Sequence, residues 1–214
     1  MMRKQWKYWA VILLAVLSVA CAEEPILQNG DLIFQANEDG GFVDAIENVT
    51  AGIWSHVGII QLREDGIYVL EATPAQGVVR TSLDDFLDAS ARDADGRPLV
   101  RIGRIRGLTS AEAAAAIERA ETWLGRPYDA AFAPGTEALY CSELVYEAFL
   151  REDGSPVFHA HPMTFKGPDG ETDPYWIRYY ERLEQEIPEG GPGTNPNDMS
   201  REPVLAPLTG LTTY

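Results

Sequence analysis

The hydrophobic pattern of the chain changes near residue 107, from short apolar runs to longer runs with helical spacing. In the first half, runs rich in β-branched and aromatic residues lie between turn-forming residues. They predict strands at 32–34, 53–62, 67–72, 78–83 and 99–106, and a short helix at 83–89. Arg63-Glu64-Asp65-Gly66 separates two of these strands and is typical of a β-hairpin. This half is therefore predicted to be mostly antiparallel sheet.

Helical signals dominate the second half. Thr109 and Glu112 form a capping-box pattern at the start of an alanine-rich run that ends at Gly125. Further helices are expected from about Cys141 to Arg151 and from Tyr175 to Leu183. Since no internal repeat or second linker divides the chain, the pattern predicts one α+β domain after the N-terminal segment.

Three stretches lack a helical or strand pattern. Residues 35–51 and 132–139 are expected to be loops that shape the binding pocket, and residues 188–203 are rich in Gly, Pro and Asn. By composition alone, this last stretch is a loop or linker.

The first 22 residues form a pattern typical of an export signal. Three basic residues precede an uncharged run from Tyr8 to Ala22, which is shorter than the roughly 20 residues of a membrane-spanning helix. Ala20-Cys21-Ala22 fits secretory cleavage after Ala22, whereas residues 17–21 resemble a bacterial lipobox, with cleavage before Cys21 and lipid on its sulfur. A retained anchor is the third interpretation. We expect export to the cell envelope, facing the periplasm or the outside, with Cys21 as the candidate lipidation site.

Charge and cysteine content exclude several classes of partner. The chain has 17 Lys and Arg against 33 Asp and Glu, a net charge of −16, which repels nucleic acid and anionic lipid headgroups. We expect no nucleic-acid partner and no membrane contact apart from an N-terminal lipid anchor. Two Cys and three His lack the spacing of a metal site, and His159 and His161 have no acid or Cys at ligand spacing. No metal or cofactor is predicted.

Cys141 is the only thiol in the predicted domain beyond the N-terminal segment. It lies at the predicted start of a helix, where unpaired N–H groups and the helix dipole favour a thiolate nucleophile. The alternative is a small buried apolar residue, because free cysteines are often buried.

His56 lies in a predicted strand, on the same face as Gly58 and Ile60. The glycine leaves room for another chain or a substrate beside the imidazole. With Asp65-Gly66 as a two-residue turn, Ile60 would pair with Glu71. Glu71 would then share the face of His56, but it would lie four residues from the position opposite His56. Contact then requires strong twist, a bulge or a shifted register. Without such a partner, His56 is a core histidine.

Five motifs together resemble one family, the circularly permuted YiiX/YebB-like members of the NlpC-type papain-like cysteine hydrolases. They lie within residues 30–149: Gly30-Asp31-Leu32-Ile33-Phe34, Ser55-His56-Val57-Gly58, Val69-Leu70-Glu71-Ala72, Gly125-Arg126-Pro127-Tyr128-Asp129 and Tyr140-Cys141-Ser142-Glu143-Leu144-Val145. The histidine precedes the cysteine in the chain, as in the permuted branch of that family. The resemblance implies a permuted papain-like fold, with residues 188–214 as an extension that folds back on the domain.

The resemblance also implies roles for individual residues. Cys141 would be the nucleophile, His56 the general base and Glu71 the acid that orients the imidazole. The backbone N–H of Cys141 would stabilise the oxyanion. Tyr128 would be a second donor or a substrate contact, against the alternative of a tyrosine packed on the core.

The function expected from these residues is an exported cysteine hydrolase that cleaves an amide or peptide bond through a thioacyl-enzyme intermediate. Cell-wall peptide is one candidate substrate. Two alternatives remain open, an acyl-lipid hydrolase or acyltransferase on the same fold, and a non-catalytic binding module. The oligomeric state does not follow from the sequence.

Overall fold

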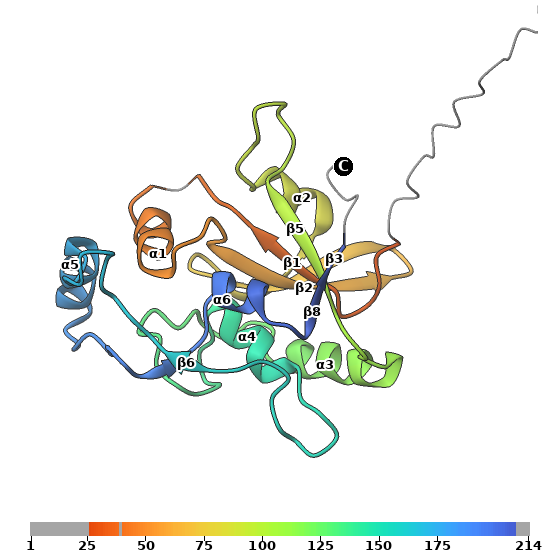
Figure 1. The fold of residues 1–214 in the computed structure, drawn as a ribbon. Coiled ribbons are helices and arrows are strands. Elements are labelled where there is room, and N and C mark those ends of the chain that lie inside the picture. Colours follow the sequence, from red (N-terminus) through yellow and green to blue (C-terminus); the bar gives the residue numbers. More distant parts are fainter. Residues whose placement is uncertain (1–25, 39, 209–214) are drawn as a thin grey trace, which may run out of the picture.

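The computed structural model describes residues 26–38 and 40–208 (Figure 1). The predicted export signal and Cys21 lie outside these residues. No helix of the described part is both long and apolar enough to cross a membrane.

An antiparallel six-stranded sheet forms the centre of the described part, with the strands in the order β4-β3-β2-β1-β5-β8. The strands are β1 (Leu32–Gln35), β2 (His56–Arg63), β3 (Gly66–Thr73), β4 (Gly77–Ser82), β5 (Val100–Ile105) and β8 (Leu205–Pro207). A separate two-stranded pair joins β6 (His161–Pro162) to β7 (Pro192–Gly193). The predicted strands therefore form, although β2 begins three residues later than expected.

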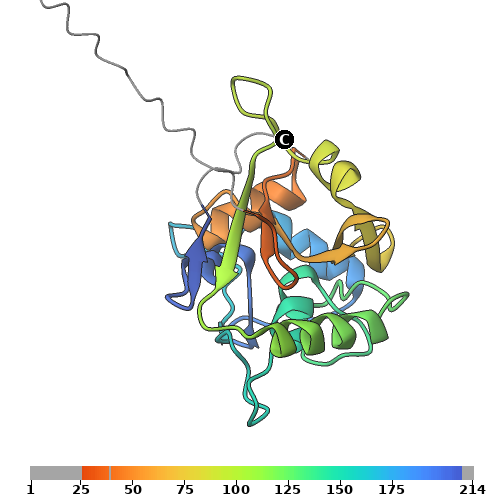
Figure 2. The same ribbon diagram turned by 90° about the vertical axis from the view of Figure 1, so that its right-hand side faces the viewer.

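Helices cover both faces of the sheet (Figures 1 and 2). They are α1 (Phe42–Thr50), α2 (Leu83–Asp88), α3 (Ser110–Thr122), α4 (Cys141–Ala148), α5 (Pro174–Leu183) and α6 (Pro196–Arg201). Alternate strand residues point to opposite faces, so Leu32 and Phe34 pack with α3 and α4, while Ile33 packs with α2. The two hydrophobic layers fix the orientation of α4, which lies along β2 and β3.

The expected loop at 35–51 is wrong, because α1 occupies residues 42–50. Phe42, Ile46 and Val49 follow helical spacing, and they pack with α5 in a third cluster beside the sheet. Figure 1 shows α1 and α5 next to each other, away from α2 and α3. Gly40 and Gly41 precede the helix, with Gly41 as its N-cap, so they do not interrupt it.

The C-terminal stretch also differs from the loop that composition predicts. Residues 192–207 contain β7, α6 and β8, and Leu205 of β8 pairs with Ile105 of β5. Leu205 is buried against Gly103, where an added Cβ would lie 2.6 Å from Leu205 Cδ2. The residues up to 208 thus fold back on the domain and extend the central sheet.

Candidate active site

Helix α4 begins at Cys141, as the sequence predicts. The preceding residue, Tyr140, has extended backbone angles, and its carbonyl accepts the N–H of Leu144 to open the helix. The first N–H groups of a helix have no acceptor within it, so the N–H of Cys141 faces outward from the first turn. Cys141 is buried, with 6% of the residue exposed.

His56 and Glu71 meet because the β2–β3 register differs from the expected one. The turn contains Glu64 and Asp65, Arg63 pairs with Gly66, and Ile60 lies opposite Val69 rather than Glu71. This two-residue shift keeps every side chain on its predicted face. Glu71 now lies two residues, rather than four, from the position opposite His56. The Nε2 atom of His56 lies 2.6 Å from Oε2 of Glu71.

Gly58 makes this contact possible in a different way from the expected one. An added Cβ would lie 2.3 Å from Cγ1 of Val69 and 3.4 Å from Cβ of Glu71. The space beside the glycine is therefore filled by β3, whose close approach carries Glu71 to the imidazole.

Glu71 is held from its other side by Thr81, a residue that the sequence analysis missed. The hydroxyl of Thr81 on β4 donates to Oε1 of Glu71. Burial raises the pKa of Glu71, but hydrogen bonds and the charge of His56, together with Thr81, outweigh it and lower the pKa below 4.5. The carboxylate is thus charged at neutral pH. Thr81 lies opposite Val69, which is two positions from Glu71 on β3, so Thr81 and Glu71 share one face of the sheet.

His56 is buried between the thiol and the carboxylate. Burial lowers its pKa, but hydrogen bonds to Cys141 and Glu71 and their charges raise the pKa to about 10. The ring also packs against Phe86 of α2, with 5.8 Å between ring centroids. Gln35, the cross-strand neighbour of His56, donates from Nε2 to the carbonyl of Phe86 over 2.7 Å. These contacts favour a protonated imidazole in one orientation.

Tyr128 lies beside Cys141 on a loop that is fixed at both ends. Gly125 and Arg126 exchange backbone hydrogen bonds with Val78 on β4, and Pro127 accepts the N–H of Leu139. Gly77 must be a glycine here, because it has φ +72° and an added Cβ would lie 2.0 Å from the carbonyl oxygen of Arg126. Burial and the charge of Cys141 raise the pKa of Tyr128 well above 10, so the hydroxyl keeps its proton. The side chain packs against the core and lines the cleft at Cys141.

Two polar residues after Cys141 support the first turn of α4. Ser142 is fully buried and accepts a hydrogen bond from Thr194, while the carboxyl of Glu143 accepts the N–H of Tyr140 over 3.4 Å. Burial, with the charge of Asp129, raises the pKa of Glu143 to about 8. These contacts give both residues a structural role at the start of α4.

A cleft opens beside Cys141, Ser142 and Tyr128. Most of its wall is apolar or aromatic: Ile46, Val49, Phe132, Met163, Phe165 and Trp176. These residues come from α1, α5 and the loops that lead to α4 and follow β6. An apolar wall with a few polar groups beside a thiol is the character of a small-molecule site.

Phe132 is held in the wall of the cleft with a left-handed backbone, φ 54°. The carboxylate of Asp129 accepts the N–H groups of residues 131 and 133, which flank Phe132. Tyr179 and Tyr180 of α5 donate to the carbonyls of residues 130 and 131. The ring of Phe132 lies 5.2 Å from that of Tyr140 and 5.8 Å from that of Trp176. Such strain in a non-glycine residue persists only where the surroundings impose it.

His159 and His161 lie on an exposed segment and are not part of the triad. His159 Nδ1 lies 2.8 Å from Oε2 of Glu202, and His161 is part of β6 at the edge of the cleft. Within residues 26–38 and 40–208, no three His, Cys, Asp or Glu side chains gather into a metal site.

Known proteins share both the sequence and the fold. The family of permuted papain-like amidase enzymes, YaeF/YiiX, C92, matches residues 26–209. The uncharacterized protein YiiX of Escherichia coli (strain K12) is 34% identical over 150 residues, which is 69% of each chain. A crystal structure described as metalloprotein yiiX from Escherichia coli O157:H7 superposes with a TM-score of 0.69 at 25% identity, covering 84% of this chain and 95% of that one.

The chain therefore belongs to the C92 family of permuted papain-like cysteine amidases. The fold is α+β, and the enzyme class is cysteine hydrolase, as the sequence predicts. The solved relative is called a metalloprotein, but the donor groups in the described part of this chain do not gather into a metal site.

Proposed function

We propose that the protein is an exported amidase in which Cys141 is the nucleophile, His56 transfers protons and Glu71 orients the imidazole. The observation that carries this proposal is that Cys141 opens α4 in the wall of the cleft, while Nε2 of His56, the charge partner of that thiol, lies 2.6 Å from Oε2 of Glu71. Because Glu71 engages Nε2, the other ring nitrogen is free to exchange a proton with the thiol.

The first half of the reaction forms a thioacyl-enzyme. The thiolate of Cys141 attacks the carbonyl carbon of the amide, and a carbon–sulfur bond forms while the carbonyl oxygen becomes an oxyanion. The protonated imidazole of His56 then gives its proton to the leaving amine as the carbon–nitrogen bond breaks. The carboxylate of Glu71 stabilises the imidazolium that this step requires.

The oxyanion needs donors that are in place before the reaction. The N–H of Cys141, at the first turn of α4, supplies one donor, and we propose the hydroxyl of Tyr128 as the second. Tyr128 suits this role because its raised pKa keeps the proton on the oxygen.

The second half regenerates the enzyme. Neutral His56 takes a proton from water, the hydroxide attacks the thioester, and the carbon–sulfur bond breaks to release a carboxylic acid. The proton on His56 and the thiolate of Cys141 then re-form the starting pair, so the cycle consumes one water and one amide.

The cleft supports an apolar group on the acyl side of the scissile bond. Its aliphatic and aromatic wall lies directly against Cys141. A cell-wall peptide with an apolar side chain is one substrate of this kind. The same wall favours the second candidate, an acyl-lipid hydrolase or acyltransferase in which the cleft takes an acyl chain. Membership of an amidase family decides against a binding module without activity.

We propose export to the cell envelope with lipid attached at Cys21. The support is the basic start, the uncharged run and the small residues around Cys21. A cysteine amidase outside the cytoplasm would meet cell-wall peptides and lipid amides.

The test compares wild type with Cys141→Ala in a Cys21→Ala background, so that Cys141 is the only thiol. We expect the substitution to abolish iodoacetamide labelling at pH 6 and hydrolysis of peptide and fatty-acyl amides, with a Tm shift of about a degree or two because one small side chain is lost. Whichever of the two substrate types, peptide amides or fatty-acyl amides, the wild-type protein cleaves faster assigns the substrate class. Hydrolysis that survives in Cys141→Ala would refute the proposed nucleophile.

A further inference from the structure

The segment from Thr194 to Asn197 joins the two elements that carry Cys141 and His56. It leads from β7 into α6, far along the chain from both residues. Composition predicts only a loop here, yet both Thr194 and Asn197 are buried, with exposures of 9% and 1%. The polar groups of Thr194 bond to residues beside Cys141, and those of Asn197 bond to residues that lead to His56.

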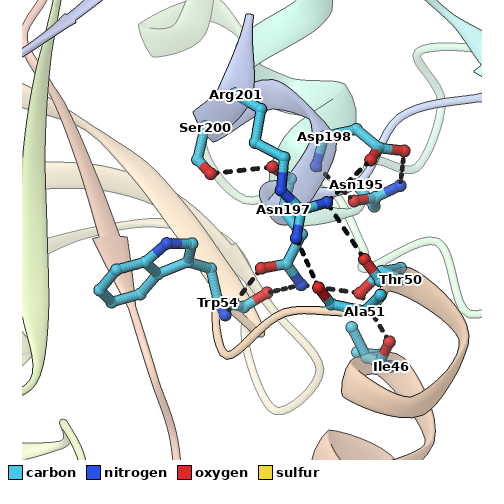
Figure 3. Close-up of polar contacts among 9 residues, drawn as sticks. All are labelled: Ile46, Thr50, Ala51, Trp54, Asn195, Asn197, Asp198, Ser200 and Arg201. Atoms are coloured by element: carbon cyan, nitrogen blue, oxygen red, sulfur yellow. Dashed lines mark hydrogen bonds and ion pairs between the residues drawn. The ribbon is translucent and has the colours of Figure 1, made fainter.

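Asn197 holds the backbone that leads into β2 (Figure 3). Its Oδ1 accepts the N–H of Trp54 over 3.0 Å, and its Nδ2 donates to the carbonyl of Trp54 over 3.0 Å. The amide thus satisfies both backbone groups of one residue, as a neighbouring strand would. Nδ2 also donates to Oγ1 of Thr50 over 2.7 Å at the end of α1.

The fit between Asn197 and this turn leaves no spare room. An added Cβ at Gly52 would lie 2.1 Å from Oδ1 of Asn197. Ser55 is fixed from the other side, since its N–H donates to the carbonyl of Gln35 on β1 over 3.1 Å. The two residues before His56 are therefore held between β1 and α6.

Thr194 holds the nucleophile helix in the same way. Its N–H donates to the hydroxyl of Tyr140 over 3.0 Å, and its Oγ1 donates to Oγ of Ser142 over 3.0 Å. These two partners flank Cys141 in the sequence. One short segment thus contacts the residues next to the thiol and the residues just before the imidazole.

We propose that Thr194 and Asn197 are positioning residues that set the distance between the Cys141 thiol and the His56 imidazole. This inference rests on the proposed triad. Asn197 is not a lining residue of the cleft, whereas Thr194 is part of its wall beside Cys141. Each acts through the backbone or side chains next to a catalytic residue. The C-terminal segment is then part of the catalytic framework as well as of the fold.

The test measures kcat, KM and the rate of Cys141 alkylation across pH for Asn197→Asp and Thr194→Val, in the Cys21→Ala background. Asn197→Asp keeps an acceptor for Trp54 but loses the donor to its carbonyl. A displacement of about 1 Å at a reacting pair costs about 100-fold, so we expect kcat and the alkylation rate at pH 6 to fall about 10- to 100-fold in both variants. KM should change little in Asn197→Asp, because Asn197 does not line the cleft. The alkaline limit of the pH profile should shift as well.

Ser200→Ala is the matched control, because Ser200 is buried on α6 but donates only to the carbonyl of Asn197 within that helix. It should lower Tm without changing kcat or the pH profile. The double variant Thr194→Val/Asn197→Asp should lose less than the product of the single losses if both residues set one distance.

His56→Ala separates the two proposals. If His56→Ala leaves the alkylation rate of Cys141 unchanged, the triad itself is wrong. If His56→Ala abolishes reactivity while Asn197→Asp and Thr194→Val change only Tm, the triad stands and the positioning role is wrong. The positioning role would also be wrong if Asn197→Asp and Thr194→Val both fail to fold while Ser200→Ala folds. The segment would then be required for folding of the whole domain.

Discussion

The Nε2 atom of His56 lies 2.6 Å from Oε2 of Glu71, although the two residues belong to different strands and are not directly opposite each other. The observed register brings Glu71 beside Gly58, two positions from His56 on the same face. A charged carboxylate and a protonated imidazole at this distance stabilise each other in a buried place.

Replacing Glu71 with Gln should lower turnover by about 10- to 1000-fold, whereas His56→Ala should be far more damaging. The carboxylate contributes to the raised pKa of His56, about 10, so its removal should lower that pKa. His56 would then lose its proton at lower pH, and the alkaline limb of kcat/KM should move down from about pH 10. A profile measured from pH 5 to 11 checks this, and an unmoved alkaline limb would show that Glu71 does not set the protonation of His56.

Thr81→Val should have a smaller effect in the same direction. The isosteric change removes the hydroxyl that donates to Oε1 of Glu71 but leaves the carboxylate and its contact with His56. Loss of one hydrogen bond to the charged form should raise the pKa of Glu71 and reduce kcat by roughly 10-fold, which corresponds to about 1.4 kcal/mol. Thr81→Ser, which keeps the hydroxyl, is the control and should retain most of the activity. Equal losses in both variants would indicate a packing effect.

Phe132 should determine how the enzyme accepts apolar acyl groups. Phe132→Ala removes an aromatic part of the cleft wall, so KM for amides with large apolar acyl groups should rise more than KM for acetyl amides. Phe132→Gly should be more stable than Phe132→Ala by about 1 kcal/mol, because φ 54° strains alanine but not glycine. Urea unfolding of the two variants measures this difference. A less stable glycine variant would mean that the left-handed backbone stores no strain.

Lipid attachment at Cys21 predicts that labelled palmitate follows the wild-type protein into the membrane fraction. Cys21→Ala should lose the label, whereas Cys141→Ala should keep it, since the lipobox pattern lies around Cys21. Equal labelling of wild type and Cys21→Ala would contradict the lipoprotein proposal and leave ordinary secretion.

The net charge of −16 predicts a preference for substrates that carry a free amine. A negative surface raises the local concentration of cationic ligands, and salt screens this effect. We expect kcat/KM to fall when the amine of a matched substrate is acetylated, and to fall less at high salt. If acetylation has no effect at either ionic strength, the acidity serves only to keep the protein soluble.

The sequence by itself determined where the chemistry lies along the chain. Cys141 follows directly on an extended residue and opens an amphipathic run, so local pattern places it at a helix start, and α4 begins there. His56 and Glu71 fall in alternating apolar runs that fold as β2 and β3. Alternation also assigned both side chains to one face, because side-chain direction in a strand depends only on parity.

Only the tertiary structure decided the distances between these residues. A two-residue shift of the β2–β3 register preserves every inward and outward position, so no hydrophobic pattern distinguishes a turn at Glu64-Asp65 from one at Asp65-Gly66. The choice depends on how closely β3 approaches Gly58, which is a packing property of the whole sheet. Similarly, residues 188–203 have the composition of a loop, and the order of Thr194 and Asn197 within them comes from buried partners such as Trp54, Tyr140 and Ser142, more than 50 residues away in the chain. Contacts between residues so far apart form only when the folded core brings them together, so local sequence does not encode them.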